Sequence, residues 1–512
     1  MNDNTPVIIG VGEASERIDA ADYKGFSPAD LAGLAARAAL DDALSAEKLA
    51  PHVDVIAAIR QFEVSGPGAV APFGKADNFP RAVAKRIGAN PARAILEPVG
   101  GQGPQHLVNE FAQAIGAGTM GMALLVGSEA ISTVRHLSSK GETRDWSETV
   151  PGELEDRGYG DPLLSRELPS HGAKTPISLY AMFENARRGR LGLDRPAYQL
   201  EMGRLFEPFT RVAATNPHAM APEFHPAEEL ATVTPRNRLT SDPFPRWVVA
   251  RDQANQGAAV LLTSVGKARE LGVPESKWIY LYGGADVKER NVVERQDLSS
   301  SPAEIMAAKR ALDVAGVGVD QIDLFDFYSC FPIAVFNVRD GLGIAADDPR
   351  PLTMTGGLPF FGGAGNNYSM HAIASMVRAL REKPKAIGLV AANGGFLSKY
   401  SVGVYSAQPK DWKPFDSKAL QAEVDAWPAP VLAGATNGSG VVETYTIDYA
   451  GKAPKGVVVG KLDGSGDRFI AMTGEGDDIV QTMIDREPLG AKVTLADDGA
   501  GHTVIKAIAP VK

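Results

Sequence analysis

The chain has 512 residues, with 62 acidic against 52 basic side chains and a formal net charge of −10. This balance argues against a general nucleic-acid binder, because affinity for the phosphate backbone comes from Lys and Arg. The length is typical of three or four folding units, and 44% hydrophobic residues can build several cores.

No run of residues approaches the ~20 apolar residues that cross a bilayer, and the first residues lack the signal-peptide pattern. We therefore expect no membrane span and a cytoplasmic protein. The single cysteine, Cys330, excludes an internal disulfide and a zinc site built on several thiolates, so no metal is expected.

The first 130 residues alternate between short apolar runs and amphipathic helices. Ser27-Pro28-Ala29-Asp30 has the chemistry of a helix start. Strands are predicted at 7–11, 53–59, 94–99 and 122–126, and a helix at 105–115. This alternation predicts a layered, largely parallel sheet.

Residues 135–251 break this rhythm and are rich in Pro, Arg and Glu. They contain two helical runs, 177–190 and 195–214, and no clear pair of strands. Alternation resumes with strands at 257–262, 279–282, 322–327 and 386–390 and a helix at 302–315. We therefore predict an inserted loop domain at 135–251 between two similar α/β halves, 1–134 plus 252–275 and 276–408.

The remaining 409–512 has a different character. Residues 411–430 are charged, contain three prolines and are typical of a linker. Short alternating runs at 440–447, 456–459, 468–471 and 492–495 predict a small appended β-barrel of the oligonucleotide-binding (OB) type. If that barrel is an independent domain, the body ending near Ser406 should fold alone.

Four turn motifs follow one another in a fixed order. They are Gly100-Gly101-Gln102-Gly103, Tyr328-Ser329-Cys330-Phe331, the run from Gly356 to Ala364, and Asn393-Gly394-Gly395. With Gln256-Gly257-Ala258-Ala259, they make residues 6–406 resemble the thiolase superfamily, especially the sterol-carrier-protein thiolase branch and thiolase-like protein type 1. The resemblance implies a duplicated thiolase fold of two layered α-β-α halves.

Thiolases act beside a coenzyme A thioester with a nucleophilic cysteine, a Gly-His-Pro histidine and a second cysteine. By this resemblance, Gly100 stands in place of the nucleophile, Gly363 in place of the histidine and Asn393 in place of the second cysteine. Tyr328 and Ser329 replace the polar pair before Cys330. The turns are kept and the reactive side chains are absent, which argues against ordinary thiolysis.

The candidate catalytic residues are therefore Tyr328, Tyr368, His371 and Asn393, which supply hydroxyl, imidazole and amide groups. The candidate substrate-binding residues are the turn glycines Gly100, Gly101, Gly362, Gly363, Gly394 and Gly395. Structural roles stay open for each of them, and Cys330 is expected to be an inert buried thiol. Arg187, Arg188 and Arg190 could hold a phosphate of coenzyme A or form a solvated helix face.

The resemblance implies a protein that binds an acyl-CoA as substrate or ligand, with no permanently bound cofactor, and that acts as a monomer or homodimer. Its expected chemistry is cleavage or formation of a carbon–carbon bond beside the thioester. One alternative is a non-catalytic binder of CoA thioesters. Another is a retro-aldolase on a β-hydroxyacyl-CoA, because some aldolases of this fold work with a small OB-fold partner that the appended β segment resembles.

Overall fold

The computed structural model describes residues 2–162 and 164–509. Helix α1 shows how local sequence sets an element boundary. The Ser27 hydroxyl accepts the Asp30 N–H (3.1 Å), the Ser27 N–H donates to the Asp30 carboxylate (3.2 Å), and Pro28 occupies the first turn. The helix start predicted at Ser27–Asp30 is confirmed.

The N-terminal half alternates strands and helices, as its sequence predicts. Its elements are β1 (Pro6–Ser15), α1 (Pro28–Ala43), α2 (Ala46–Leu49), β2 (Val55–Ile59), α3 (Phe79–Ile87), β3 (Arg93–Glu97), α4 (Gly103–Gly116), β4 (Met122–Ala130), α5 (Ile131–Ser139), β8 (Asn255–Ser264) and α10 (Val265–Glu270).

The C-terminal half repeats this pattern. Its elements are β9 (Ile279–Lys288), α11 (Pro302–Ala315), β10 (Leu324–Phe327), α12 (Pro332–Gly341), α13 (Tyr368–Glu382), β11 (Ile387–Gly394) and β12 (Lys399–Ser406). Helix α11 has the predicted bounds, because Pro302 opens it and the left-handed Gly316 ends it.

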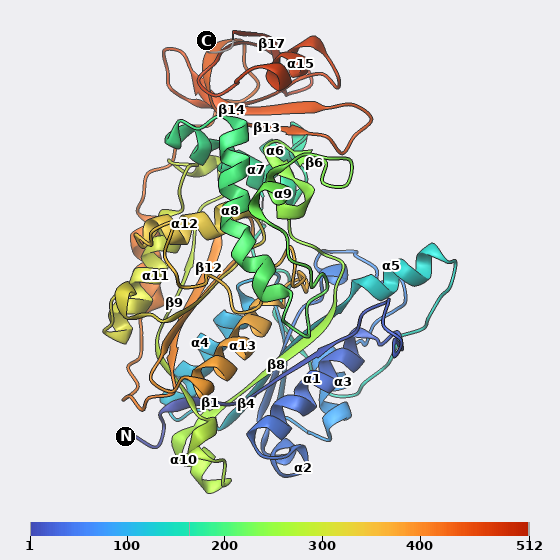
Figure 1. Ribbon diagram of the computed structural model, residues 1–512, viewed down its shortest axis with the longest axis vertical. Coiled ribbons are helices and arrows are strands. Elements are labelled where there is room, and N and C mark those ends of the chain that lie inside the picture. Colours follow the sequence, from blue (N-terminus) through green and yellow to red (C-terminus); the bar gives the residue numbers. More distant parts are fainter. Residues whose placement is uncertain (1, 163, 510–512) are drawn as a thin grey trace.

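Ten of the described strands form one sheet, in the order β10-β11-β12-β9-β1-β8-β4-β2-β3-β5. The halves meet where β1 pairs with β9, and from this seam each half repeats one order, β1-β8-β4-β2-β3 against β9-β12-β11-β10. Helices α4 and α13 pack on each other and contact strands of both halves, whereas α1 and α11 cover the outer faces (Figure 1). This is the predicted duplicated, layered α/β architecture. The prediction of a largely parallel sheet is wrong, because β1, β8, β9 and β12 pair antiparallel with their neighbours in the middle of the sheet.

The inserted segment contains β5 (Glu155–Asp156), α6 (Glu167–Ser170), α7 (Pro176–Leu191), α8 (Arg195–Ala213), α9 (Ala227–Ala231), β6 (Leu239–Ser241) and β7 (Phe244–Pro245). Strand β5 pairs with β3 and so covers that edge of the large sheet. Strands β6 and β7 form a short hairpin that the sequence pattern did not reveal.

The C-terminal region begins with α14 (Ser417–Asp425) and continues with β13 (Gly438–Asp448), β14 (Lys455–Leu462), β15 (Arg468–Met472), α15 (Asp478–Asp485), β16 (Lys492–Asp497) and β17 (Thr503–Ala509). Five of these described strands close a barrel in the order β13-β14-β15-β17-β16-β13. Helix α15 lies between β15 and β16 in the chain. The predicted β-barrel is confirmed, and its strand order and helix are those of an OB-fold.

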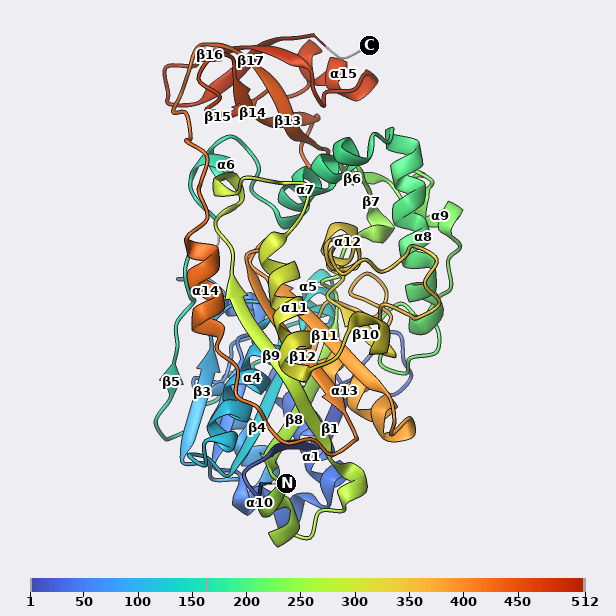
Figure 2. The same ribbon diagram turned by 90° about the vertical axis from the view of Figure 1, so that its left-hand side faces the viewer.

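The barrel is fastened to the inserted segment rather than held only by a linker. It sits on α7 in both views (Figures 1 and 2). The 411–430 stretch, predicted as a linker, contains α14, whose Leu420 and Val424 are buried in the core of the body beside β9. Contacts at both ends therefore tie the C-terminal region to the rest of the chain.

Candidate active site

The turns that follow β3, β10 and β11 converge with the start of α7 on one cavity of about 520 Å³. Its wall combines the turn between β3 and α4, the turn between β10 and α12, the segment before α13, the turn between β11 and β12, and residues 249–252. The exposed wall is mostly apolar. A mostly apolar hollow with a few polar groups is the usual form of a small-molecule site.

The first turn strains any side chain at Gly100 and would require Gln102 to move aside. Its φ is +154°, and a Cβ there would lie 2.1 Å from Gln102 Oε1. The same amide oxygen would lie 2.3 Å from a Cβ on Gly394. Gln102 therefore fills the space between two of the turns, a role that no sequence pattern indicates.

Tyr328 occupies the next position on this wall. Its hydroxyl would lie only 2.3 Å from a Cβ on Gly101, so the phenol takes the space that a side chain there would need. The ring meets Tyr368 edge to face, with centroids 5.4 Å apart. Burial raises the pKa of Tyr328 well above its usual value, so its hydroxyl stays protonated and is a hydrogen-bond donor to the cavity.

Asn393 and Cys330 lie beside each other on the cavity wall. The Tyr180 hydroxyl donates to Asn393 Oδ1 (3.3 Å), and among the described residues Asn393 Nδ2 has no partner although it is buried. Burial raises the pKa of Cys330 to about 12, so its thiol stays protonated at neutral pH. Asn393 thus offers an unused donor to the cavity.

Two predicted catalytic residues do not line the cavity. His371 is fully buried behind it, with Nδ1 2.6 Å from Glu13 Oε1. Burial raises the pKa of Glu13, but His371 and Arg378 outweigh it and lower that pKa to about 2. The expectation that His371 faces the substrate is not met, because the buried Glu13 carboxylate holds its imidazole.

Tyr368 also points into the protein interior. Its hydroxyl is 2.6 Å from Thr355 Oγ1 and 3.5 Å from Asp326 Oδ1. Burial raises the pKa of Asp326 to about 7. Tyr368 therefore belongs to a buried polar network behind Tyr328 and not to the cavity wall, where it was expected.

Five of the six predicted binding glycines line the cavity, namely Gly100, Gly101, Gly363, Gly394 and Gly395. Gly362 is absent from the wall, and a Cβ there would lie 2.9 Å from Gln256 Oε1. At Gly363 a Cβ would lie 3.1 Å from the Arg251 carbonyl oxygen. The backbone thus crowds Gly363, the position that the resemblance to thiolases assigns to the histidine.

Arg187 and Arg188, the first two arginines of the run on α7, form neither a phosphate site nor a solvated helix face. Arg187 is 2% exposed and pairs with Glu201 (3.0 Å) and Asp340 (2.9 Å). Arg188 is 1% exposed and pairs with Glu487 of the barrel (2.6 Å). These cations hold the fold together, which corrects both readings of the run.

Helix α7 connects the barrel to the cavity. Its first turns place Pro176, Ile177 and Tyr180 on the cavity wall. Further along, Asn185 donates to the Tyr445 carbonyl oxygen of the barrel (3.1 Å), and Arg188 donates to the Tyr445 hydroxyl (3.0 Å). The barrel therefore fixes the helix that forms one side of the candidate site.

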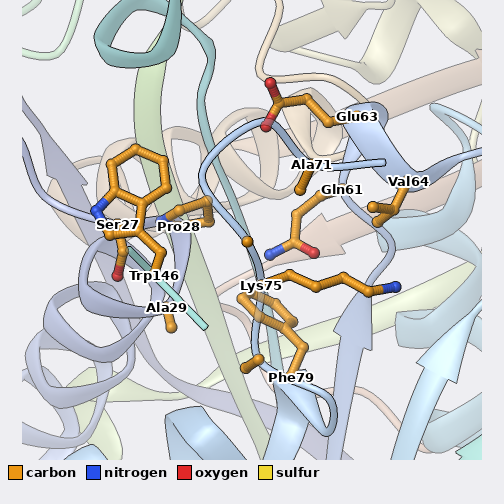
Figure 3. A pocket seen from close by; sticks show the side chains of 12 residues that line it. Ser27, Pro28, Ala29, Gln61, Glu63, Val64, Ala71, Lys75, Phe79 and Trp146 are labelled. Carbon is orange, nitrogen blue, oxygen red and sulfur yellow. The ribbon is translucent and has the colours of Figure 1, made fainter. Parts of the chain in front are cut away.

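A second hollow lies beside the loop that carries Glu63 and Lys75, against Trp146 and the start of α1 (Figure 3). Its volume is about 20 Å³. That is room for about one water molecule and not for a metabolite.

Among the described residues, no group of three or more His, Cys, Asp or Glu side chains is placed to hold a metal ion. No described helix is long and apolar enough to cross a membrane.

Glu129, at the end of β4, is a buried carboxyl next to the cavity wall. Its Oε1 accepts the Phe62 N–H (2.7 Å), and a Cβ on Gly365 would lie 2.0 Å from that oxygen. Burial raises the pKa of Glu129 from 4.5 to about 8. Between about pH 4.5 and pH 8, Glu129 therefore keeps its proton in the folded protein and loses it in the unfolded chain.

We expect this proton to make stability fall as pH rises from about 4.5 to about 8. Glu129→Gln is uncharged throughout, so relative to wild type it should gain roughly 1 kcal/mol or more of unfolding free energy between pH 5 and pH 8. Urea denaturation at both pH values measures this gain. The exposed Glu47→Gln serves as control, and an equal pH dependence of Glu129→Gln and wild type would contradict the prediction.

Comparisons with known proteins agree with this architecture. Residues 419–500 match the family described as the thiolase-like protein type 1 additional C-terminal domain. The crystal structure of a monomeric SCP2-thiolase-like protein type 1 from Mycobacterium smegmatis is 43% identical, with a TM-score of 0.85, and the match covers 99% of this chain and 100% of that one. No curated protein matches the chain.

Two more distant structures share the fold. The Ltp2–ChsH2(DUF35) aldolase is 18% identical with a TM-score of 0.59, and the match covers 80% of this chain and 99% of that one. The dimeric peroxisomal thiolase of Saccharomyces cerevisiae is 15% identical with a TM-score of 0.56, covering 80% of this chain and 98% of that one. The Mycobacterium protein is far more similar in sequence and is matched over its whole length, and the chain therefore belongs to the SCP2-thiolase-like protein type 1 family.

Proposed function

We propose that the protein binds an acyl-CoA thioester in the 520 Å³ cavity and makes or breaks a carbon–carbon bond beside the thioester without an acyl-enzyme. The observation that carries this proposal is the Tyr328 hydroxyl, which stands against Gly101 where the family's reacting groups meet. A phenol can transfer a proton but does not replace the missing thiolate. The reaction class that fits is therefore of the aldol type.

The proposed reaction is cleavage of a β-hydroxyacyl-CoA. The bond between the α and β carbons breaks, and the β carbon becomes a carbonyl carbon. The electron pair of the broken bond passes to the α carbon and forms the thioester enolate. The hydroxyl proton ends on that α carbon, with Tyr328 as the relay, so the products are an aldehyde or ketone and a shorter acyl-CoA. The reverse direction joins the same two compounds.

The enolate oxygen needs hydrogen-bond donors. Asn393 Nδ2 is buried, lines the cavity and has no partner among the described residues. Helices α4 and α13 both begin at the turns that line the cavity, and their N-terminal ends carry partial positive charge. These groups would stabilise the enolate, and the Tyr328 hydroxyl would hold the substrate oxygen.

A second candidate is a non-catalytic carrier or sensor of CoA thioesters. Burial raises the pKa of the Tyr328 phenol and of the Cys330 thiol on the cavity wall, so both stay protonated, and this observation favours a carrier. A carrier needs the cavity and its donors but no proton relay. Strand β5 covers the sheet edge at β3, and the Mycobacterium relative is monomeric, which supports a monomer in either case.

Tyr328→Phe distinguishes the two functions. We expect the variant to bind acyl-CoA within about threefold of wild type but to cleave β-hydroxyacyl-CoA esters about 10²- to 10⁴-fold more slowly. The assay is release of the carbonyl product from a series of ester chain lengths. Tyr282→Phe, remote from the cavity wall, is the control. If wild type binds the esters but cleaves none, the carrier function replaces the aldol-type reaction.

A further inference from the structure

Arg251 is an exposed arginine on the wall of the cavity. Its backbone is held on both sides, because its N–H donates to the Leu358 carbonyl oxygen (3.1 Å) and its carbonyl oxygen accepts the Gly363 N–H (2.7 Å). The residue is thus fixed to the segment that carries the turn before α13. Only its long side chain is free to move.

The guanidinium of Arg251 has no hydrogen-bond or ion-pair partner among the described residues. Arg246, whose positive charge acts on Arg251, is likewise exposed and has no side-chain partner among those residues. By contrast, the neighbouring Arg135 pairs with Asp252, and the buried Arg187 and Arg188 are fully paired. Two adjacent cations are therefore left uncompensated at one edge of the cavity.

The surrounding charges do not remove this excess. Of the two nearby carboxylates, Asp252 is engaged by Arg135, and Glu223 is 78% exposed on the surface. Partial burial and the positive charge of Arg246 lower the pKa of Arg251, against the opposing effect of Glu223 and Asp252. In a chain of net charge −10, this is a local positive site beside an apolar cavity.

We propose that Arg251, assisted by Arg246, binds a phosphate group of the ligand whose acyl end lies in the cavity. Two guanidinium groups whose charges act on each other suit a doubly charged phosphate or a pyrophosphate better than a single carboxylate. The inference rests on the proposed function for the nature of the ligand. It goes further by assigning the polar end of that ligand to residues 246–251, and not to the arginines of α7.

The test compares two thioesters with the same acyl group, acetoacetyl-CoA and acetoacetyl-pantetheine, of which only the first carries phosphates. Titration calorimetry at fixed salt gives both dissociation constants. We expect wild type to bind the CoA ester more tightly, and Arg251→Gln to weaken that binding about tenfold while leaving the pantetheine ester unchanged. Arg246→Gln should have the same selectivity with a smaller effect.

Arg37→Gln, on the surface of α1, is the matched control and should change neither constant. Melting temperatures check that each variant is folded. Equal affinity of wild type for the two esters, or unchanged CoA-ester affinity in Arg251→Gln, would overturn this inference and leave the proposed function standing. Binding of neither ester to wild type would overturn the proposed function as well.

Discussion

Gly100→Cys, which places a cysteine where the resemblance to thiolases implies the nucleophile, should leave thiolysis of acetoacetyl-CoA at background. A Cβ at residue 100 would lie 2.1 Å from Gln102 Oε1, and φ there is +154°, so the new side chain is strained. The imidazole that would activate the thiol is also missing at Gly363. Because nucleophile and base act as a unit, one restored group gains little.

The measurement is release of acetyl-CoA by Gly100→Cys and by Gly100→Ala, its matched control for strain. Both variants should lose about 1–3 kcal/mol of stability, from the strained backbone. The account also expects Gly100→Cys with Gly363→His to stay inactive, because the Arg251 carbonyl oxygen would lie 3.1 Å from the new Cβ. Thiolysis well above background in either cysteine variant would show that the turn is still shaped for a nucleophile.

Removing the C-terminal region should prevent the body from folding stably. A chain of residues 1–408 would leave Arg188, 1% exposed, without Glu487 and Tyr445. It would also uncover the part of the core that Leu420 and Val424 close. The apolar surface that α14 and the barrel cover would then face water, at about 25 cal/mol per Å² of exposed apolar area, which is a large loss for a marginally stable protein.

We expect the 1–408 chain to be insoluble or to melt without cooperativity under conditions where the full chain is soluble. The full-length variant Glu487→Gln isolates the ion pair and should lower the melting temperature, whereas Glu275→Gln on the surface should not. A soluble 1–408 chain with a cooperative transition close to that of the full-length protein would show that the body is an independent unit.

The sequence predicts the elements because local chemistry fixes them. Pro302 and Gly316 delimit α11, and Ser27 and Asp30 start α1. The glycine turns also predict where the cavity lies, because glycines mark tight turns of the backbone and can be recognised without knowledge of distant partners. The alternation of strands and helices also predicts two similar halves, but not the strand order or the antiparallel pairing of the middle strands.

Side-chain partners distant in sequence could not be predicted in this way. The imidazole of His371 meets Glu13, 358 positions away, and Arg188 meets Glu487, 299 positions away. A helical period gives a side chain's direction only relative to its own helix and does not identify its partner. Gln102 and the unpaired Arg251 became visible only through the space and partners around them.

The central claim is that the cavity binds a CoA thioester without forming an acyl-enzyme. The most direct test incubates wild type with acetoacetyl-CoA and coenzyme A, and then records bound ester, thioester loss and intact protein mass in the same sample. We predict saturable binding, no acetyl-CoA above background and an unmodified protein mass. An acylated protein, robust turnover to acetyl-CoA, or no binding of the ester would contradict the account.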